Sequence, residues 1–188
     1  MRVLIILMIL IGYSAFGQDN PVNPILEKYR DDERFTRVYI SGKMLSLMAS
    51  SADEEDEEDE DSIFEKDDDE DIKKALSSLS GIQILSSEEL DRDESRSLFL
   101  ESEDLLKGKG YEELMVVKER DQEFLFLIKE ENNQIDELIL LGYETEECCG
   151  ESSFFLLTLY GIIDLKSISD VGDALDIEGL EKLEKLEE

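Results

Sequence analysis

Two adjacent cysteines are the first residues in this chain whose type and spacing could support chemistry. Cys148 and Cys149 are the two cysteines of the sequence. In an oxidising compartment they can pair with each other in a strained ring that acts as a redox switch, or with another chain. Their spacing differs from the Cys-x-x-Cys redox motif, and a chain without histidine gives a structural zinc site little support. A tolerated loop feature is the simplest interpretation, with a redox switch and an intermolecular bridge as alternatives.

A dense carboxylate tract is the second such feature. Residues 53–61 and 67–71 are all acidic and flank a small apolar island. Carboxylate oxygens suit hard cations, so weak calcium binding is one expected role. The tract lacks the glycine turn and the fixed oxygen spacing of an EF-hand loop, however, and like charges at this density repel one another into extended chain. We therefore interpret residues 51–71 as a disordered, solvated insert. The weak cation candidates are Asp53, Glu54, Asp56, Asp67, Asp68 and Asp69.

Composition argues against several classes of function. The sequence has 19 Lys and Arg against 50 Asp and Glu, a formal net charge of -31, which repels nucleic acid and anionic lipid. The absence of histidine removes imidazole as a general base and as the middle member of a catalytic triad. No cofactor-binding loop is recognisable, so we expect no cofactor and no enzyme activity.

The pattern of the other polar side chains does not indicate an active site. Acidic pairs such as Asp136 with Glu137, or Glu113 with Glu123, are typical of solvated strand surfaces that protect sheet edges. Tyrosines could line a binding face, although packing at the core or its boundary is their commoner role. The tyrosines in question are Tyr39, Tyr111, Tyr143 and Tyr160.

The N-terminus has the three parts of an export signal. A charged start at Arg2 precedes an apolar run over residues 3–11 and small residues at 15–17. This run is shorter than the roughly 20 residues that a membrane span needs. We predict cleavage of residues 1–17 and an exported protein, periplasmic or extracellular, without an integral membrane span. An uncleaved anchor or a buried N-terminal helix is the alternative.

Four short apolar runs predict strands, which would position the polar side chains and the cysteines described above. Each run is bounded by charge or turn residues and is too short for a typical helix. Asn132 and Asn133 tolerate the positive φ of a tight hairpin turn between the second and third runs. The four runs are residues 113–118, 124–128, 138–141 and 154–160.

Shorter patterns predict the remaining elements. Both prolines fall within residues 18–34, which we interpret as a linker with one helical turn at 25–29. Ser86 and Glu89 fit a capping box for a helix that reaches Leu106, and Asp164 is placed to cap another over 165–175. Further predictions are strands at 35–40 and 82–85, helices at 43–49 and 72–79, and an amphipathic helix carrying Leu180, Leu183 and Leu186.

Together these elements predict an α+β fold. We expect an antiparallel sheet of about five or six strands, with helices packed on one face in a two-layer arrangement. A chain of 188 residues with 41% hydrophobic content can bury one core, so a single domain is expected over residues 35–188.

Three stretches resemble a known family. Residues 35–45, 110–118 and 154–165 are similar, in order and spacing, to the DUF4252 family of exported proteins from Bacteroidetes-type bacteria. The resemblance covers residues 35–186. It implies a small α+β envelope domain with no established activity and no catalytic residues to carry over. The acidic insert and the loop of Cys148 and Cys149 depart from the family's pattern.

These observations favour a non-catalytic protein-interaction module of the cell envelope. Its unknown protein partner would contact an exposed face or edge of the sheet. The alternative is an acidic protein that binds or buffers divalent cations through the tract at residues 53–71.

Overall fold

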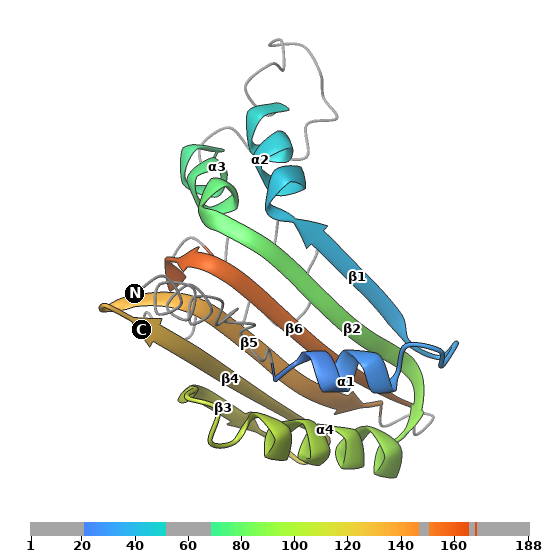
Figure 1. Cartoon of the computed structure of the whole chain (residues 1–188). Coiled ribbons are helices and arrows are strands. Elements are labelled where there is room, and N and C mark those ends of the chain that lie inside the picture. The colour runs from blue at the N-terminus through green and yellow to red at the C-terminus, as the bar shows by residue number, and fades with distance from the viewer. Residues whose placement is uncertain (1–20, 52–68, 147–150, 166–167, 169–188) are drawn as a thin grey trace, which may run out of the picture.

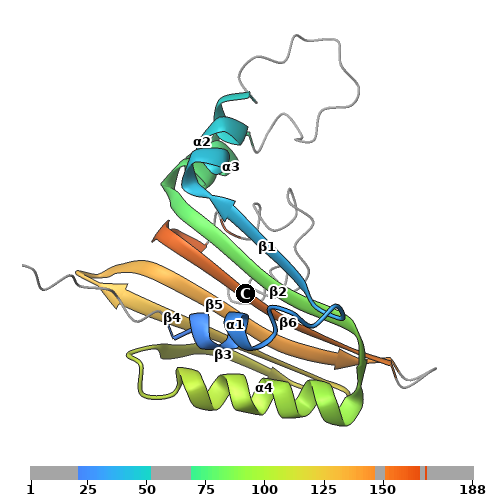
Figure 2. The ribbon, with the colours of Figure 1, turned by 45° about the vertical axis from the view of Figure 1, so that its right-hand side comes forward.

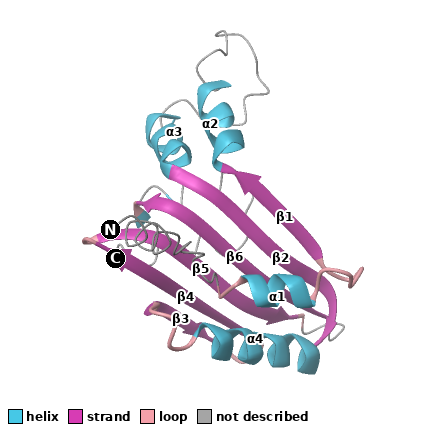
Figure 3. Ribbon diagram, viewed as in Figure 1, coloured by secondary structure: helices cyan, strands magenta, loops and turns pink. Residues whose placement is uncertain are grey.

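One six-stranded antiparallel sheet is the frame of the domain (Figures 1 and 3). The computed structural model describes residues 21–51, 69–146, 151–165 and 168. Along the sheet the strands follow the order β1-β2-β6-β5-β4-β3, and every neighbouring pair is antiparallel. The predicted antiparallel sheet is confirmed, with β1 and β3 at its edges. The strands are β1 (Thr36–Ser41), β2 (Leu79–Asp91), β3 (Glu112–Lys118), β4 (Gln122–Glu131), β5 (Gln134–Thr145) and β6 (Glu151–Ile163).

Four helices among the described residues surround this sheet. They are α1 (Asn23–Lys28), α2 (Gly42–Ser51), α3 (Asp69–Ser78) and α4 (Arg92–Leu106). Figures 1 and 2 place α1 and α4 in front of the strands, whereas α2 and α3 stand together beyond the ends of β1 and β2. The helices predicted at 43–49 and 72–79 are confirmed.

The central strands are buried on both sides. In β4, Phe124 and Phe126 enter one core while Leu125 and Leu127 enter the other. Successive strand side chains point to opposite faces, which explains why this apolar run has no polar alternation. The α2–α3 core includes Leu45, Leu76, Ile82, Phe126, Leu140 and Leu157. The α1–α4 core includes Ile25, Leu85, Phe99, Leu127, Leu141 and Leu156.

The helices contribute to both cores, so their predicted packing on one face only is not confirmed. Ile25 of α1 and Phe99 of α4 lie in one core, and Leu45 of α2 and Leu76 of α3 lie in the other. A strand such as β4, apolar at five consecutive positions, requires an apolar neighbour on each side.

The segments expected as linker and insert both include ordered helix. Val22, Ile25 and Leu26 are buried in the α1–α4 core, so residues 18–34 contribute to the domain rather than only leading into it. At the other segment, α2 extends to Ser51 and α3 begins at Asp69. Residues 52–68 of the predicted insert lie outside the described residues.

The predicted capping box at Ser86 is wrong. Strand β2 continues through Ser86 and Ser87, which pair with β6, and α4 begins only at Arg92. The cap is Asp91, whose carboxylate oxygen Oδ1 accepts a hydrogen bond from the backbone N–H of Glu94 at 2.8 Å. Pairing with the long strand β6 extends β2 past a sequence that is locally suited to a helix start.

Two sites with positive φ, one in a turn and one in a strand, show what the backbone requires. Asn132 and Asn133 have φ of 56° and 63° and join β4 to β5, as predicted. Gly161, near the end of β6, has a φ of 126°. A Cβ added there would lie 2.5 Å from the carbonyl oxygen of Ser78, so both the backbone angle and the space require glycine.

Only the start of the predicted C-terminal helices can be compared. The N–H of Ile168 donates to the carbonyl oxygen of Asp164 at 3.1 Å, as in the first turn of a helix. Residues 169–188, with Leu180, Leu183 and Leu186, lie outside the described residues.

Candidate interaction surface

The edge formed by β1 and α2 carries an unusual share of exposed apolar side chains. Eight large apolar residues are exposed in the part of the chain that the structure describes. Four of them lie on these two consecutive elements, and together we call them the β1–α2 edge: Val38, Tyr39, Met44 and Leu47. Tyr39 is the most exposed, at 66%. Val38 and Tyr39 are consecutive in β1 and point to opposite faces of the sheet, so the four side chains share an edge rather than one continuous patch.

The opposite edge of the sheet is protected. Strand β3 carries Glu112, Glu113 and Lys118, and its pairing with β4 shifts register between Glu113 and Met115. Charged side chains and bulges of this kind discourage the addition of another strand. By contrast, Arg37 is the one charged residue of β1, and its pairing with β2 runs without a register shift.

A small pocket lies beside the exposed strand. It has a volume of about 290 Å³, at the small end of the range of about 300–1,000 Å³ for small-molecule sites. Elements α1, β1 and β2 supply its lining: Leu26, Arg37, Val38, Tyr39, Gln83 and Ile84.

A row of polar and aromatic side chains crosses the α1–α4 face from this pocket. Tyr39 pairs with Gln83 across β1 and β2, and the Tyr160 hydroxyl donates to Oε1 of Gln83 at 2.9 Å. Tyr160 in turn is the register partner of Glu137, whose Oε1 accepts a hydrogen bond from the Tyr111 hydroxyl at 2.6 Å. Three of the four tyrosines noted in the sequence are thus brought into one row.

Glu137 is the buried end of that row. Its side chain is only 8% exposed, and burial raises the pKa of its carboxyl above the usual value, an effect that the hydrogen bond from Tyr111 and the charge of Lys129 partly oppose. Burial and the bond to Glu137 also raise the pKa of the Tyr111 hydroxyl. The hydrogen bond between the two side chains joins the residue before β3 to β5.

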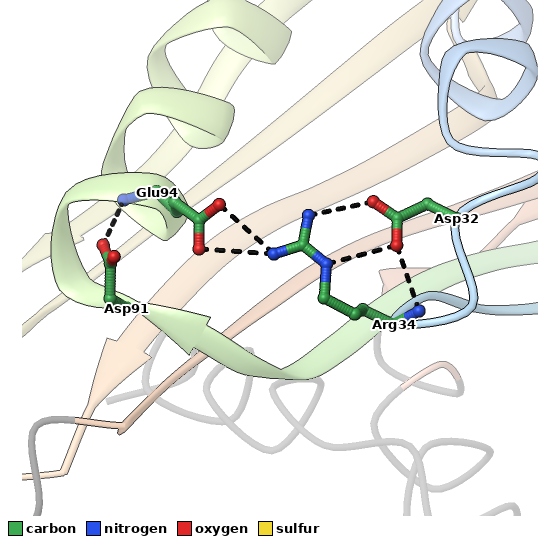
Figure 4. A network of polar contacts seen from close by, with 4 residues as sticks. All are labelled: Asp32, Arg34, Asp91 and Glu94. Atoms are coloured by element: carbon green, nitrogen blue, oxygen red, sulfur yellow. Dashed lines mark hydrogen bonds and ion pairs between the residues drawn. The ribbon is translucent and has the colours of Figure 1, made fainter.

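Figure 4 shows the contacts that hold the segment before β1. The Arg34 guanidinium donates to Asp32 at 2.9 Å and to Glu94 at 3.2 Å, and so connects this segment to the first turn of α4. The hydrogen bonds from Arg34 hold the pKa of the Asp32 carboxyl below its usual range. On β1 itself, Arg37 lies 3.9 Å from a carboxylate oxygen of Glu27.

A larger acidic cavity lies at the other end of the sheet. Its volume is about 1110 Å³, and its lining includes Glu88, Glu89, Asp91, Glu94, Glu144, Glu146 and Glu151. Within the described residues, no group of three or more acidic or cysteine side chains is placed to hold a metal ion. The nearby hydroxyl of Ser152 is buried and bonded to Ser95 at 2.5 Å and to Thr145 at 3.0 Å.

The comparison with protein families decides what kind of chain this is. A model described as Domain of unknown function (DUF4252) matches residues 29–171. The chain belongs to the DUF4252 family. No curated protein and no solved structure matches it.

Several residues singled out in the sequence of this DUF4252 domain lie away from the row. Tyr143 is buried in the α1–α4 core, with its ring 5.4 Å from that of Phe99. Glu123 forms an ion pair with Lys118 at 2.7 Å rather than sharing a site with Glu113. Cys148 and Cys149 lie outside the described residues, as do the cation candidates Asp53, Glu54, Asp56, Asp67 and Asp68. Asp69 is the first residue of α3.

Sequence reasoning missed the pocket and the β1–α2 edge of the DUF4252 domain. The sequence indicates Tyr39 only as one of several tyrosines that could line a binding face, because its position beside Gln83 depends on the pairing of β1 with β2. The available signal was the run Met44 to Met48 after a short strand, which has apolar residues on more than one side of a helix. Among the described residues, no helix is long and apolar enough to cross a membrane.

Proposed function

We propose that this DUF4252 domain is an exported, non-catalytic protein-interaction module of the cell envelope that binds its partner through the β1–α2 edge. The observation that carries the proposal is that, in the part of the chain that the structure describes, half of the exposed large apolar residues lie on β1 and α2. Burial of such side chains in an interface gains about 25 cal/mol per Å² of apolar area, which favours association.

The polar groups of the domain support binding rather than catalysis. The buried hydroxyl of Ser152 is hydrogen-bonded to the hydroxyls of Ser95 and Thr145, and the sequence has no histidine to activate them. Glu137 is held by Tyr111 in a contact between strands. The rigid sheet thus positions an exposed apolar edge, which is the arrangement that a binding module needs.

Export is the second part of the proposal. Residues 1–17 have the charged, apolar and small-residue regions of a signal peptide. Mass spectrometry of the protein from periplasmic and culture fractions tests it. The proposal predicts a mature chain that begins at Gln18, and a cytoplasmic chain that retains residues 1–17 would contradict it.

Cation binding by residues 53–71 is the alternative. Most of that tract lies outside the described residues, so the calcium hypothesis stays a prediction from carboxylate chemistry.

Affinity purification from the source cells tests the binding role. Three forms of the full chain are compared: wild type, Val38→Lys with Leu47→Lys, and Val116→Lys with Leu100→Lys as the control. All four side chains are exposed, so each double variant adds the same charge without disturbing a core. We expect a partner that co-purifies with wild type and control but is reduced at least about tenfold with the first variant, the equivalent of about 1.4 kcal/mol. Equal recovery with all three forms would contradict the proposal.

A further inference from the structure

Arg37 is the one charged residue that lines the pocket beside β1. Its Nη2 atom lies 3.9 Å from Oε1 of Glu27, which is longer than a hydrogen bond, while Oε2 of Glu27 accepts a hydrogen bond from Arg30 at 2.9 Å. Within the described part of the chain, the Arg37 side chain has no other ion pair. Its planar set of N–H donors is therefore available to a ligand in the pocket.

Gln83 supplies a second donor to the same pocket. Its Oε1 accepts the hydrogen bond from the Tyr160 hydroxyl at 2.9 Å, which leaves its side-chain NH2 group without a partner among the residues that the structure describes. Gln83 is the register partner of Tyr39, which lies two residues from Arg37 along β1, so Gln83 and Arg37 share one face of the sheet. Two sets of N–H donors therefore border one pocket.

The rest of the pocket lining is apolar or aromatic. It consists of Leu26 from α1, Val38 and Tyr39 from β1, and Ile84 from β2. Apolar walls with a small number of placed polar groups are the usual make-up of a ligand site, in which the polar groups fix the orientation of the ligand. The volume of about 290 Å³ limits the apolar part of such a ligand to a small group.

We propose that this pocket binds a carboxylate attached to a small apolar group. The carboxylate accepts hydrogen bonds from Arg37 and Gln83, and the apolar group packs against Leu26 and Tyr39. A guanidinium and a carboxylate form charge-assisted hydrogen bonds, which are about twice as strong as neutral ones. A free small carboxylic acid and the C-terminal residue of a protein share this chemistry. The inference goes beyond the proposed function because it holds for either source.

The charge around the pocket is compatible with an anion although the whole chain is acidic. Residues 21–51, which include α1 and β1, have five Lys and Arg against four Asp and Glu. Residues 79–87 of β2 have no charged side chain, so the net charge of -31 arises outside these two segments. At physiological ionic strength, salt screens exposed charges that are more than about 8 Å apart. The nearby cation therefore outweighs distant carboxylates.

An NMR titration of the full chain, followed by amide chemical shifts, tests the inference. The probe is N-acetyl-leucine, which carries one carboxylate beside an isobutyl side chain, and N-acetyl-leucinamide is its neutral match. At physiological salt we expect N-acetyl-leucine to shift the β1 amides and the side-chain NH2 group of Gln83 saturably. The leucinamide should bind at least about tenfold more weakly, since it loses the charge-assisted hydrogen bonds.

Two variants and a control assign the contact to named side chains. Arg37→Gln removes the guanidinium and should weaken binding of N-acetyl-leucine at least about tenfold. Arg96→Gln removes the same charge from an exposed position of α4 and should leave binding unchanged. Gln83→Glu keeps an acceptor for Tyr160 but replaces the N–H donors with a carboxylate, so it should abolish binding. Urea unfolding of each variant checks that the fold is retained.

An acetylated tetrapeptide of three glycines and a C-terminal leucine distinguishes the two sources of the ligand. Tighter binding of the peptide than of N-acetyl-leucine would assign the pocket to the C-terminal residue of a protein, and equal binding would assign it to a free carboxylic acid. Absence of saturable shifts with both probes, equal binding of the leucinamide, or full binding by Arg37→Gln would overturn the inference. The affinity purification leaves Arg37 and Gln83 in place, so it judges the proposed function separately.

Discussion

The Tyr160 hydroxyl donates a hydrogen bond to Oε1 of Gln83 at 2.9 Å and so connects β6 to β2 beside the exposed strand β1. Gln83 also lines the pocket next to Tyr39. Tyr160 on β6 therefore fixes a side chain on β2, the neighbour of the edge strand β1. This contact couples the packing of the sheet to the shape of the surface that we propose binds a partner.

Removing that hydroxyl should loosen the pocket without unfolding the domain. Tyr160→Phe leaves the ring in place and deletes one neutral hydrogen bond, so the unfolding free energy should fall by about 0.5–1.5 kcal/mol. Urea denaturation measures the change. Binding of the proposed partner should weaken in parallel because Gln83 is no longer held. A loss of several kcal/mol would show that the ring itself is displaced.

Glu137 should make stability depend on pH. Its raised pKa means that the folded state takes up a proton at a higher pH than the unfolded chain does. The unfolding free energy should therefore increase as pH falls from neutral through the folded pKa, and this gain is complete below the unfolded value of about 4.3. Glu137→Gln keeps an acceptor for Tyr111 and removes the titration.

The comparison of wild type with Glu137→Gln isolates this effect from the many other carboxyl groups. At neutral pH the variant should be as stable as wild type or more stable, because it avoids a buried charge. The difference between the two unfolding free energies should shrink as pH falls. A variant that is clearly less stable at neutral pH would show that ionised Glu137, with Lys129 nearby, is stabilising instead.

Gly161 should tolerate no side chain. Gly161→Ala combines a φ of 126° with a Cβ 2.5 Å from the Ser78 carbonyl oxygen, so we expect a loss of at least about 2 kcal/mol. Gly108→Ala is the matched control. Its φ of 73° is also positive, but no atom lies within 4 Å of an added Cβ, so the cost should be about 1 kcal/mol. Equal losses in thermal or urea melts would contradict the role assigned to the close contact at Gly161.

The acidic tract should be dispensable for folding. Replacing residues 53–67 with a glycine and serine linker of equal length should change the unfolding free energy by less than about 0.5 kcal/mol at physiological salt, as for most surface changes. Calorimetric titration with calcium should give both forms the same weak, salt-sensitive heat. Saturable heat seen only with the native tract would instead support cation binding as the function.

Local patterns predicted the strands because each apolar run is short and bounded. The run from Phe124 to Ile128 indicates a buried strand from its residue types alone. The same local view failed at Ser86, where pairing with β6 extends β2 through a sequence that resembles a helix cap. Local patterns also fail to predict that residues 18–34 contribute to the core. The burial of Ile25 and Leu26 depends on the sheet face above which α1 lies.

The proposed interaction surface is less predictable because it depends on strand order. Tyr39, Gln83 and Tyr160 come from three strands, and only the order β1-β2-β6 places them side by side. Nothing in their local sequence indicates that register. Which edge of the sheet carries the exposed apolar side chains depends on the topology.

Site-specific photo-crosslinking in the source cells tests the central claim most directly. A photoreactive amino acid is placed at Tyr39 on β1 in one form of the full chain and at Val116 on β3 in another. Both positions are exposed edge-strand residues, so they sample solvent in a comparable way. The proposed binding role predicts a discrete adduct of one partner protein from position 39 and none from position 116. No adduct from position 39, or the same adduct from both positions, would contradict it.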